Sequence, residues 1–519
     1  MGVGERDTRA NAATVTVAAS DSPFRTRADY VCDGTDDGVE INAAIDKIES
    51  IGGTVQLMGG TYTLHSTGII EKQAIRLQGE SLGATKIVAG TGHSLTAGLI
   101  TLESVSEFTG GGVFDLSLVG DGTIDTGGTG RAAKDATVDG ISAVNAGALF
   151  NFAVERCSIQ KFKRGWNADG ASTYCRERFV TFDSNEIWYN TVGIWMNEHI
   201  NVNANDLRYN DIGIDGDLFD ANFSCVRACY NRIGITGSAF GENCGVYNCF
   251  IQGGAIFANA EEGLVLRGPS TVCGVHFGTA SVIDTWLTLK GHGNNISGCS
   301  FISQDYSAPW TLGASTAAIK LYTGIHNNLV TGCYFYNAGG PIIDVNTTGV
   351  ISGFMFDNNT INLVGYPILS ETSGQGSLRS CSISNNHIWL GAALNAPIIE
   401  LQQLGSSVSG NRFCNNTVLS ESATNKPTCF FKGNLSRSHC TGNNLLIPES
   451  YNVPMLDETC TTTNALVYNN SGGGAYTPII CNHGATAATA RPPWPGVVQW
   501  IGSVEPTNAA ANDVWISTA

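Results

Sequence analysis

The sequence predicts an all-β fold, a single-stranded right-handed parallel β-helix solenoid with a short N-terminal capping helix. The main observation is a motif of the form Tyr-Asn-x-x-Gly-Ile that begins at Tyr189, Tyr209 and Tyr230, at intervals of 20 and 21 residues. A repeat this short cannot enclose a core of its own, so successive copies must stack and share one. The copies contain Asn, Gly and β-branched residues without helical periodicity, so each is expected to form a coil of short strands and turns.

Composition supports this fold and argues against several functions. The 519 residues include 63 Gly, 42% are hydrophobic and 14% are charged, which fits a turn-rich solenoid rather than a disordered chain. The net charge of −17 and the absence of any basic run argue against binding to nucleic acid or to anionic membranes. Residues 1–13 are polar, and no apolar run approaches the length of a membrane span, so we expect neither a signal peptide nor a membrane anchor.

The sixteen cysteines do not follow a disulfide or zinc pattern. Because several occur at one phase of the repeat, just before a predicted strand, we expect a column of reduced, buried thiols. Disulfides between Cys225 and Cys229 or between Cys244 and Cys249 are the alternative. Without a CxxC pair the sequence supports no zinc ribbon, and we predict no metal and no cofactor. The cysteines that share the phase are Cys157, Cys249, Cys299, Cys333 and Cys381.

An N-terminal module precedes the repeats. A turn rich in aspartate at 33–38 leads into an amphipathic stretch at 39–48, which predicts a helix with Asp36 or Asp37 as N-cap. The Gly-Gly-Thr-Val-Gln-Leu run at 52–57 predicts a strand, and Gly-Gly-Thr-Tyr at 59–62 predicts a turn into another strand. The same turn could be read as a calcium loop, but a turn and helix cap is the favoured interpretation. We predict a connector at 1–30, the module at 31–110, coils at 111–450 and a C-terminal segment at 451–519.

This order of acidic turn, helix and glycine-rich strands resembles the N-terminal module of the pectate-lyase-like superfamily. Together with the coils and the segment at 505–516, it is similar to bacteriophage tailspike and tail-fibre proteins of that class. The resemblance implies a homotrimer in the virion tail that binds, and often cuts, a bacterial surface polysaccharide. It also implies synthesis in the host cytoplasm and attachment to other virion tail proteins through the N-terminus.

The repeats also predict which face carries chemistry. Aligning Gly165, Gly193, Gly213 and Gly234 turns the next residue inward and the following one outward. One outward column then contains Trp195 and Asp215, and a second one, two residues further along, contains Asp169, Asn197, Asp217 and Arg267.

Carboxylates in these columns would lie near the separation of roughly 6.5–9.5 Å found in inverting glycosidases, because residues i and i+2 of a strand are roughly 6.6 Å apart. We therefore predict Asp215 and Asp217 as the leading catalytic pair, with Asp169 as a further candidate. The predicted substrate-binding residues are Trp195, Trp188, Asn197, Arg267 and Glu198.

Three alternatives remain open at this point. The same acids with Arg267 could support a polysaccharide lyase, which cleaves by β-elimination. The fold could instead serve a non-catalytic receptor-binding or structural tail protein. Outward aspartates could also do no more than solubilise the coils.

Overall fold

The computed structural model describes most of the chain, in two compact units at 1–260 and 261–519. Among the described residues no helix has the length and apolar character needed to cross a membrane. The division at 260 differs from the predicted boundaries at 30, 110 and 450, which stay predictions. The described residues are 13–125, 133–144, 146–168, 176–237, 245–279, 285–303, 317–322, 324–338, 340–345, 349–363, 367–371, 377–390, 396–401, 409–420, 427–433, 437–446, 466–468, 471–472, 499–502 and 514–517.

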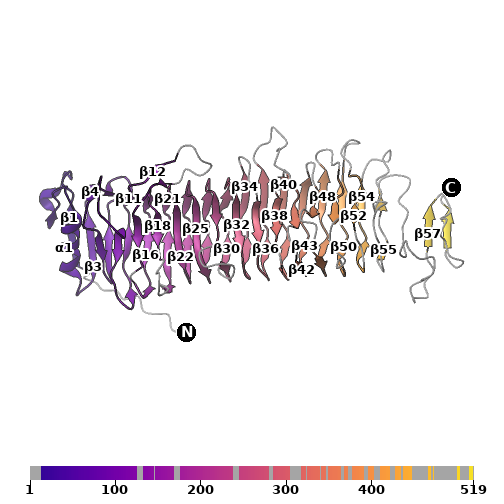
Figure 1. Cartoon of the computed structure of the whole chain (residues 1–519), viewed down its shortest axis with the longest axis horizontal. Helices are drawn as coiled ribbons and strands as arrows, with labels where there is room; N and C mark the ends of the chain where they lie inside the picture. Colours follow the sequence, from indigo (N-terminus) through magenta and orange to yellow (C-terminus); the bar gives the residue numbers. More distant parts are fainter. Residues whose placement is uncertain are drawn as a thin grey trace. The chain divides into compact units, whose positions relative to one another are not determined.

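The first unit consists mainly of three parallel sheets, and from residue 53 to residue 235 each coil contributes one strand to each sheet (Figure 1). Sheet A contains β1 (Ala13–Ala18), β2 (Tyr30–Val31), β3 (Gly53–Leu57), β6 (Ile75–Gln78), β10 (Gly112–Phe114), β16 (Ala153–Glu155), β20 (Val180–Asp183), β23 (Ile200–Asn203), β26 (Asn222–Ser224) and β30 (Phe250–Gln252). Sheet B contains β4 (Gly60–Leu64), β7 (Thr85–Ala89), β11 (Ser117–Val119), β17 (Ser158–Gln160), β21 (Glu186–Trp188), β24 (Asp206–Arg208), β27 (Arg227–Cys229) and β31 (Ala255–Phe257). Sheet C contains β5 (Ile69–Glu71), β8 (Gly98–Leu102), β14 (Asp139–Ser142), β18 (Arg164–Asn167), β22 (Val192–Asn197), β25 (Ile212–Phe219) and β28 (Ile233–Ile235).

Shorter elements accompany these sheets. The helix α1 (Gly38–Ile48) contacts β1 and β5, and a 3₁₀ turn, η1, spans Arg25–Arg27. A strand after β28, β29 (Val246–Tyr247), pairs with the end of β25. Three further strands, β9 (Phe108–Thr109), β15 (Ala148–Phe150) and β19 (Arg176–Arg178), pair in parallel, and β12 (Thr123–Ile124) pairs antiparallel with β13 (Ala133–Lys134).

The second unit has the same three-sheet organisation. Sheet A′ contains β33 (Thr271–Cys273), β36 (Asn295–Ser297), β39 (Leu329–Thr331), β43 (Met355–Asp357), β47 (Ser382–Ser384), β50 (Arg412–Cys414), β53 (His439–Thr441) and β55 (Leu466–Tyr468). Sheet B′ contains β34 (His276–Thr279), β37 (Ser300–Ser303), β40 (Tyr334–Ala338), β44 (Thr360–Leu363), β48 (His387–Leu390), β51 (Thr417–Leu419), β54 (Asn444–Leu446) and β56 (Ser471–Gly472). Sheet C′ contains β32 (Glu262–Leu266), β35 (Thr285–Leu289), β38 (Ala317–Leu321), β41 (Ile343–Val345), β45 (Leu369–Glu371), β49 (Ile399–Leu401) and β52 (Phe431–Gly433). The remaining strands form the parallel pairs β42 (Val350–Ser352) with β46 (Ser377–Arg379), and β57 (Gln499–Gly502) with β58 (Val514–Ser517).

These sheets confirm the parallel β-helix that the repeats predict. Aligned glycines on sheet C lie where neighbouring coils touch, since a Cβ on Gly193 would come within 2.5 Å of the carbonyl oxygen of Gly213. The same short approach holds between Gly165 and Gly193 and between Gly213 and Gly234. Only a residue without a side chain fits there, which explains why glycine recurs at this phase.

Buried asparagines connect the coils at the turn after sheet B. The carboxamide oxygen of Asn210 accepts bonds from the backbone N–H and the Nδ2 of Asn190, at 2.9 and 3.0 Å. Asn210 donates in turn to Asn231, and Asn231 to Asn259. The residue before each ladder position takes the left-handed conformation, with φ of 57° at Tyr209. These bonds form a side-chain ladder that runs from Asn190 through Asn210 and Asn231 to Asn259.

The cysteines behave as the repeat phase predicts. Cys157, Cys249, Cys299, Cys333 and Cys381 are buried and carry free thiols. Each thiol lies within 3.5 Å of the carbonyl oxygen two residues earlier in the chain. Cys225 and Cys229 are also free thiols in this structure, and the alternative pair with Cys244 falls outside the described residues.

The predicted N-terminal helix is confirmed, with Asp37 at its N-cap position. Its buried face contains Ile41, Ala44, Ile45 and Ile48, but Val39 is 54% exposed, so including Val39 in the apolar face was wrong. Val39 lies in the first turn of the helix. That the helix closes the end of the solenoid stays a prediction.

Candidate functional site

Sheet C brings the predicted polar columns into register on neighbouring coils. Trp195 of β22 pairs with Asp215 of β25, and Asn197 pairs with Asp217. On the preceding coil, Asn167 of β18 pairs with Trp195. The glycine alignment therefore predicted the register of both columns correctly for these coils.

The first column is much less exposed than an outward position suggests. Trp195 is 3% exposed and Asp215 is 6% exposed. The guanidinium carbon of Arg164 lies 5.5 Å from the centre of the Trp195 ring, a cation–π contact that covers the indole. The outward position predicted for Trp195 therefore does not leave its ring open to a ligand, because alternation along a strand fixes the direction of a side chain but not what packs over it.

Asp217 lies in the second column and is half-buried. Gly216 precedes it with φ of 132°, and a Cβ at Gly216 would lie 1.9 Å from the carbonyl oxygen of Met196. Glycine is thus required for β25 to continue close to β22 and carry Asp217 beside Asn197. The N–H of Gly216 also donates to Oδ1 of Asp215 at 2.8 Å.

The environment of Asp217 favours its protonated form. Partial burial raises the pKa of the Asp217 carboxyl, and the negative charge of Glu198 raises it further. The N–H of Gly245, 3.4 Å from Oδ1, opposes this effect. A carboxyl with a raised pKa beside a second carboxylate is a typical arrangement for general acid catalysis.

A partly exposed group of charges adjoins Asp217. The side chain of Glu198 is 37% exposed, and its Oε2 lies 3.9 Å from Nδ1 of His199. Nε2 of His199 lies 3.3 Å from Oδ2 of Asp220 at the end of the next coil. Glu198 is thus more accessible than Asp215 and lies close enough to Asp217 to act on its ionisation.

One carboxyl of this region was missed by the sequence argument. Asp139, the first residue of β14, is 8% exposed, and its Oδ2 accepts a bond of 2.6 Å from Nδ2 of Asn167. Asn167 in turn accepts from Nη1 of Arg164 at 2.8 Å, so Asp139 belongs to the network that covers Trp195. Burial raises the pKa of Asp139, against the effects of Asn167 and Arg164. Asp139 precedes the first Tyr-Asn motif, so the repeat alignment gave no signal for it.

Trp188 does not join this group. Trp188 belongs to sheet B, where it pairs with Gln160 and Arg208, and a turn at 189–191 separates it from β22. Grouping it with Trp195 was wrong, because this turn takes the chain from one sheet to the next. Asp169 lies outside the described residues, and Arg267 belongs to the second unit.

The acidic turn before α1 has a structural role. Asp36 accepts bonds from the backbone N–H groups of His65, Ser66 and Thr67 and from the Ser66 hydroxyl. Burial raises the pKa of Asp36, but the bonds from the Ser66 hydroxyl, His65 and Thr67 outweigh it and lower the pKa. Asp37 makes no side-chain bond to α1, because its two oxygens accept from the N–H groups of Gly34 and Thr63, each at 2.8 Å.

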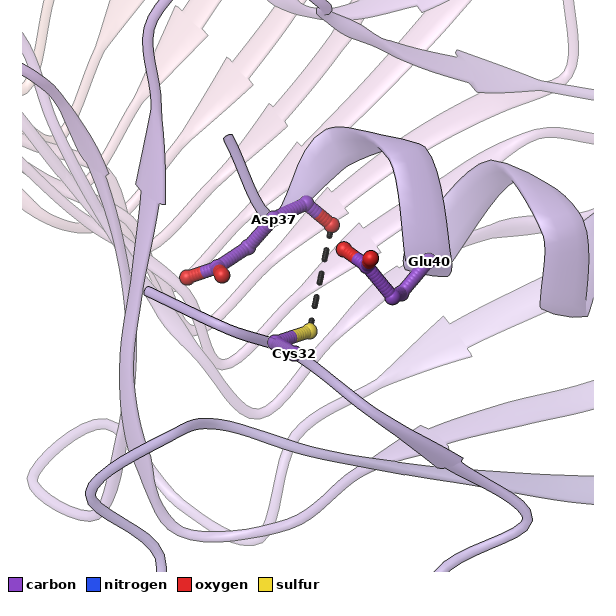
Figure 2. Close-up of side chains that lie close together, drawn as sticks. All are labelled: Cys32, Asp37 and Glu40. Atoms are coloured by element: carbon purple, nitrogen blue, oxygen red, sulfur yellow. Dashed lines mark hydrogen bonds between the residues drawn. The ribbon is translucent and has the colours of Figure 1, made fainter. Parts of the chain in front are cut away.

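Figure 2 shows a small cluster at this turn, in which the Cys32 thiol lies 3.9 Å from the Asp37 carbonyl oxygen, with Glu40 beside it. The Cys32 sulfur and one carboxylate oxygen each from Asp37 and Glu40 lie within 4.8 Å of one another. Both Asp37 oxygens already accept backbone bonds, and burial raises the pKa of the Cys32 thiol. We therefore give these three side chains a structural role in the turn and do not assign them as metal ligands.

No protein-family model matches this sequence, and neither does any curated protein. A solved tailspike protein of E. coli bacteriophage HK620, bound to a pentasaccharide, is similar to it at 13% identity over 85% of this chain and 75% of that one, with a TM-score of 0.46. The catalytic domain of a GH87 α-1,3-glucanase bound to tetrasaccharides is 14% identical over 77% of this chain and 67% of that one, with a TM-score of 0.38. Tailspike protein 3 of bacteriophage CBA120 is 11% identical over 83% of this chain and 59% of that one, with a TM-score of 0.40. Because these identities and TM-scores are low, the function proposed below is argued from the residues of this chain.

Proposed function

We propose that this protein binds and depolymerises a polysaccharide of the bacterial surface, with Asp217 as the proton donor of a glycoside hydrolysis. The observation that supports this most directly is the half-buried Asp217 carboxyl beside Glu198, on a coil that also carries Asp215. A parallel β-helix presents such residues in columns along which an extended sugar chain can lie.

Two carboxyl groups with different ionisation are what this reaction needs. Asp217 donates its proton to the leaving glycosidic oxygen, and a carboxylate takes a proton from the water that attacks the anomeric carbon. The raised pKa of Asp217 keeps it protonated at higher pH than an ordinary aspartate. Glu198 and Asp215 are the two candidates for the base, and Glu198 is the better one because water reaches it more readily.

The neighbouring residues then have supporting roles. Asn197, which pairs with Asp217, is as buried as Trp195, and its Nδ2 donates to the carbonyl oxygen of Ala168 at 3.3 Å, so we assign it to the support of the strand beside the acid and not to a bond with the sugar. Trp195 is too buried to stack on a sugar ring, and we assign it instead to holding Arg164 in place. The predicted homotrimer and the attachment to a phage tail belong to the same proposal and follow from the resemblance to tailspikes.

The proposal is tested by incubating the protein with purified capsular, exopolysaccharide and wall glycans and measuring new reducing ends. The absorbance of unsaturated uronates is read in parallel, because only a lyase produces it. Asp217→Asn should lower the rate about 10²–10⁴-fold, the usual contribution of a general acid. Glu198→Gln and Asp215→Asn are compared next. The base is the residue whose substitution lowers the cleavage rate while substrate binding stays unchanged.

Asp183→Asn is the matched control, since Asp183 is also a half-buried aspartate but belongs to sheet A. Reducing ends without the absorbance support hydrolysis, whereas ends with it identify a lyase. Binding without any cleavage would contradict the proposed activity and favour a receptor-binding protein.

A further inference from the structure

Sheet B′ differs from the other sheets of the second unit in having no formal charge. Its strands follow one another along this unit (Figure 1), and the eight that the structure describes contain no Asp, Glu, Lys or Arg. The strands of sheet C′, by contrast, include charged residues such as Lys320, Asp344 and Glu400. In a chain with a net charge of −17, a sheet depleted of charge indicates a surface that contacts a ligand or a partner.

Two columns of outward side chains run over five of these strands, from β40 to β54. They follow the backbone register, in which Asn362 of β44 pairs with Trp389 of β48, and Trp389 pairs with Leu419 of β51. The residues between the two columns, such as Ile361 and Ile388, are buried, so the columns point outward. We call the two columns the aromatic strip. One contains Tyr334, Thr360, His387, Thr417 and Asn444, and the other contains Tyr336, Asn362, Trp389, Leu419 and Leu446.

Aromatic rings of the strip reach the surface. Trp389 is 44% exposed and Tyr334 is 40% exposed, whereas Trp195 of the candidate site is 3% exposed. Among the tryptophans whose burial the structure describes, only Trp389 is exposed. Its indole is therefore better placed than that of Trp195 to stack on a ligand.

A packed core supports the strip from below. Phe335, between Tyr334 and Tyr336 on β40, stacks on Phe301 of β37, with ring centres 4.6 Å apart and planes 6° apart. Phe301 stacks in the same way on Phe277 of β34, at 4.7 Å. Because the core and the strand register fix the backbone beneath them, the outward rings lose little freedom when a ligand binds.

The strip is long and narrow. Its strands lie roughly 4.8 Å apart, so the four steps from β40 to β54 span roughly 19 Å, while the two columns are roughly 6.6 Å apart. Tyr336 and Trp389 are separated by two steps, with Asn362 between them. A stable protein–protein interface, with about 800 Å² from each partner, needs a broader surface than two columns of side chains. One extended polymer chain fits these dimensions better than a second protein.

The side chains of the strip suit an uncharged sugar. Eight of its ten residues carry a hydrogen-bonding group, namely two tyrosines, two threonines, two asparagines, His387 and Trp389, and only the two leucines lack one. Aromatic rings pack against the C–H face of a sugar ring, while hydroxyl and amide groups bond to its hydroxyls. A sugar carboxylate would find no Lys or Arg on these strands to replace its hydration.

We propose that the aromatic strip binds an uncharged stretch of polysaccharide, with the Trp389 ring stacked on a sugar and the neighbouring polar groups bonded to sugar hydroxyls. The strip contains no carboxyl group, so it binds without cleaving and adds a second contact to the candidate site around Asp217. The choice of a polysaccharide rests on the proposed function, while the uncharged class follows from the strip itself.

The test is calorimetric titration of the full chain with four hexasaccharides. Maltohexaose, mannohexaose and xylohexaose are the uncharged probes, and hexagalacturonate is the acidic one. At least one uncharged probe should bind more tightly than hexagalacturonate, and added salt should leave its affinity unchanged because no ion pair contributes.

Substitutions connect this binding to the strip. Trp389→Ala should weaken the uncharged probe about 10-fold or more, whereas Trp389→Phe, which keeps a ring, should retain most of the affinity. Phe250→Ala is the matched control, because Phe250 is an aromatic residue of similar exposure, 41%, on sheet A of the first unit. The inference is overturned if no uncharged probe binds, if hexagalacturonate binds more tightly than all three, or if Trp389→Ala leaves the affinity unchanged.

Two further measurements separate this inference from its alternatives. Sedimentation compares the mass of the wild type with that of Trp389→Ala, and a lower mass in the variant would show that another copy of the chain covers the strip, which would overturn the inference. Asp217 lies in the first unit, so Asp217→Asn should bind the uncharged probe as the wild type does. Binding that depends on Trp389 in a protein that cleaves no glycan supports the strip and contradicts the hydrolase. Cleavage by a protein whose binding does not depend on Trp389 supports the hydrolase and contradicts the strip.

Discussion

Glu71 should make the stability of this protein fall as the pH rises through the weakly acidic range. It is the last residue of β5 and is 0% exposed, while Ile70 before it is 47% exposed. Alternation along the strand therefore turns the Glu71 side chain into the core. Burial raises the pKa of this carboxyl well above its ordinary value of 4.5, and the N–H of Gly112 offsets the effect only in part.

The sign and size of the effect follow from linkage. In the unfolded chain Glu71 loses its proton near pH 4.5, but in the folded protein it keeps the proton to a higher pH. Because the folded state binds the extra proton between these two pKa values, the free energy of unfolding falls by about 1.4 kcal/mol per pH unit over that interval. Below the unfolded pKa both states are protonated, and the full contribution to stability is present.

Glu71→Gln removes this titration while it keeps the size and shape of the side chain. Denaturation midpoints of the wild type and the variant are measured from pH 4 to pH 8. The difference in stability between the variant and the wild type at pH 4 is the reference. Relative to that difference, the variant should gain stability over the wild type as the pH rises. Glu107→Gln, which changes an exposed carboxylate, is the control and should show no such trend. A constant difference between Glu71→Gln and the wild type over the whole range would refute the reasoning.

Three further substitutions test the scaffold around the site. Asn210→Ala leaves buried partners of the asparagine ladder unpaired and should cost about 1–3 kcal/mol for each, seen as a lower denaturation midpoint. Gly216→Ala forces a Cβ against the carbonyl oxygen of Met196 and should abolish glycan cleavage; full activity would contradict the role given to this glycine. Arg164→Ala should uncover Trp195, giving a red-shifted tryptophan emission and stronger quenching by acrylamide than in the wild type. Unchanged quenching would show that something else covers the indole.

The sequence was sufficient to predict the fold and the strand register because both depend on local repetition. Gly193 and Gly213 had to be glycines where the backbones of adjacent coils meet, so aligning them placed Trp195 beside Asp215. The asparagine ladder was predictable for the same reason, since one residue type recurs at each turn.

The burial of the site could not be predicted in this way. Trp195 is covered by Arg164, a residue of the previous coil whose side chain reaches across from β18. Asp139 joins the same network through Asn167, a contact between β14 and β18 that no repeat unit contains. Alternation along a strand states which way a side chain leaves the backbone, whereas exposure depends on side chains of other coils.

The scaffold explains how residues with different chemistry can occupy equivalent places. Inside the coils, small and apolar residues are fixed by contact, as Gly193 is by the carbonyl oxygen of Gly213. Further along the strands of sheet C the paired residues differ in chemistry, as Asn197 of β22 and Asp217 of β25 do. Substituting Asp217 should change catalysis far more than stability, whereas substituting the glycines and asparagines should do the reverse. A repeat fold of this kind can thus change the sugar it recognises by altering one column of side chains while the core stays the same.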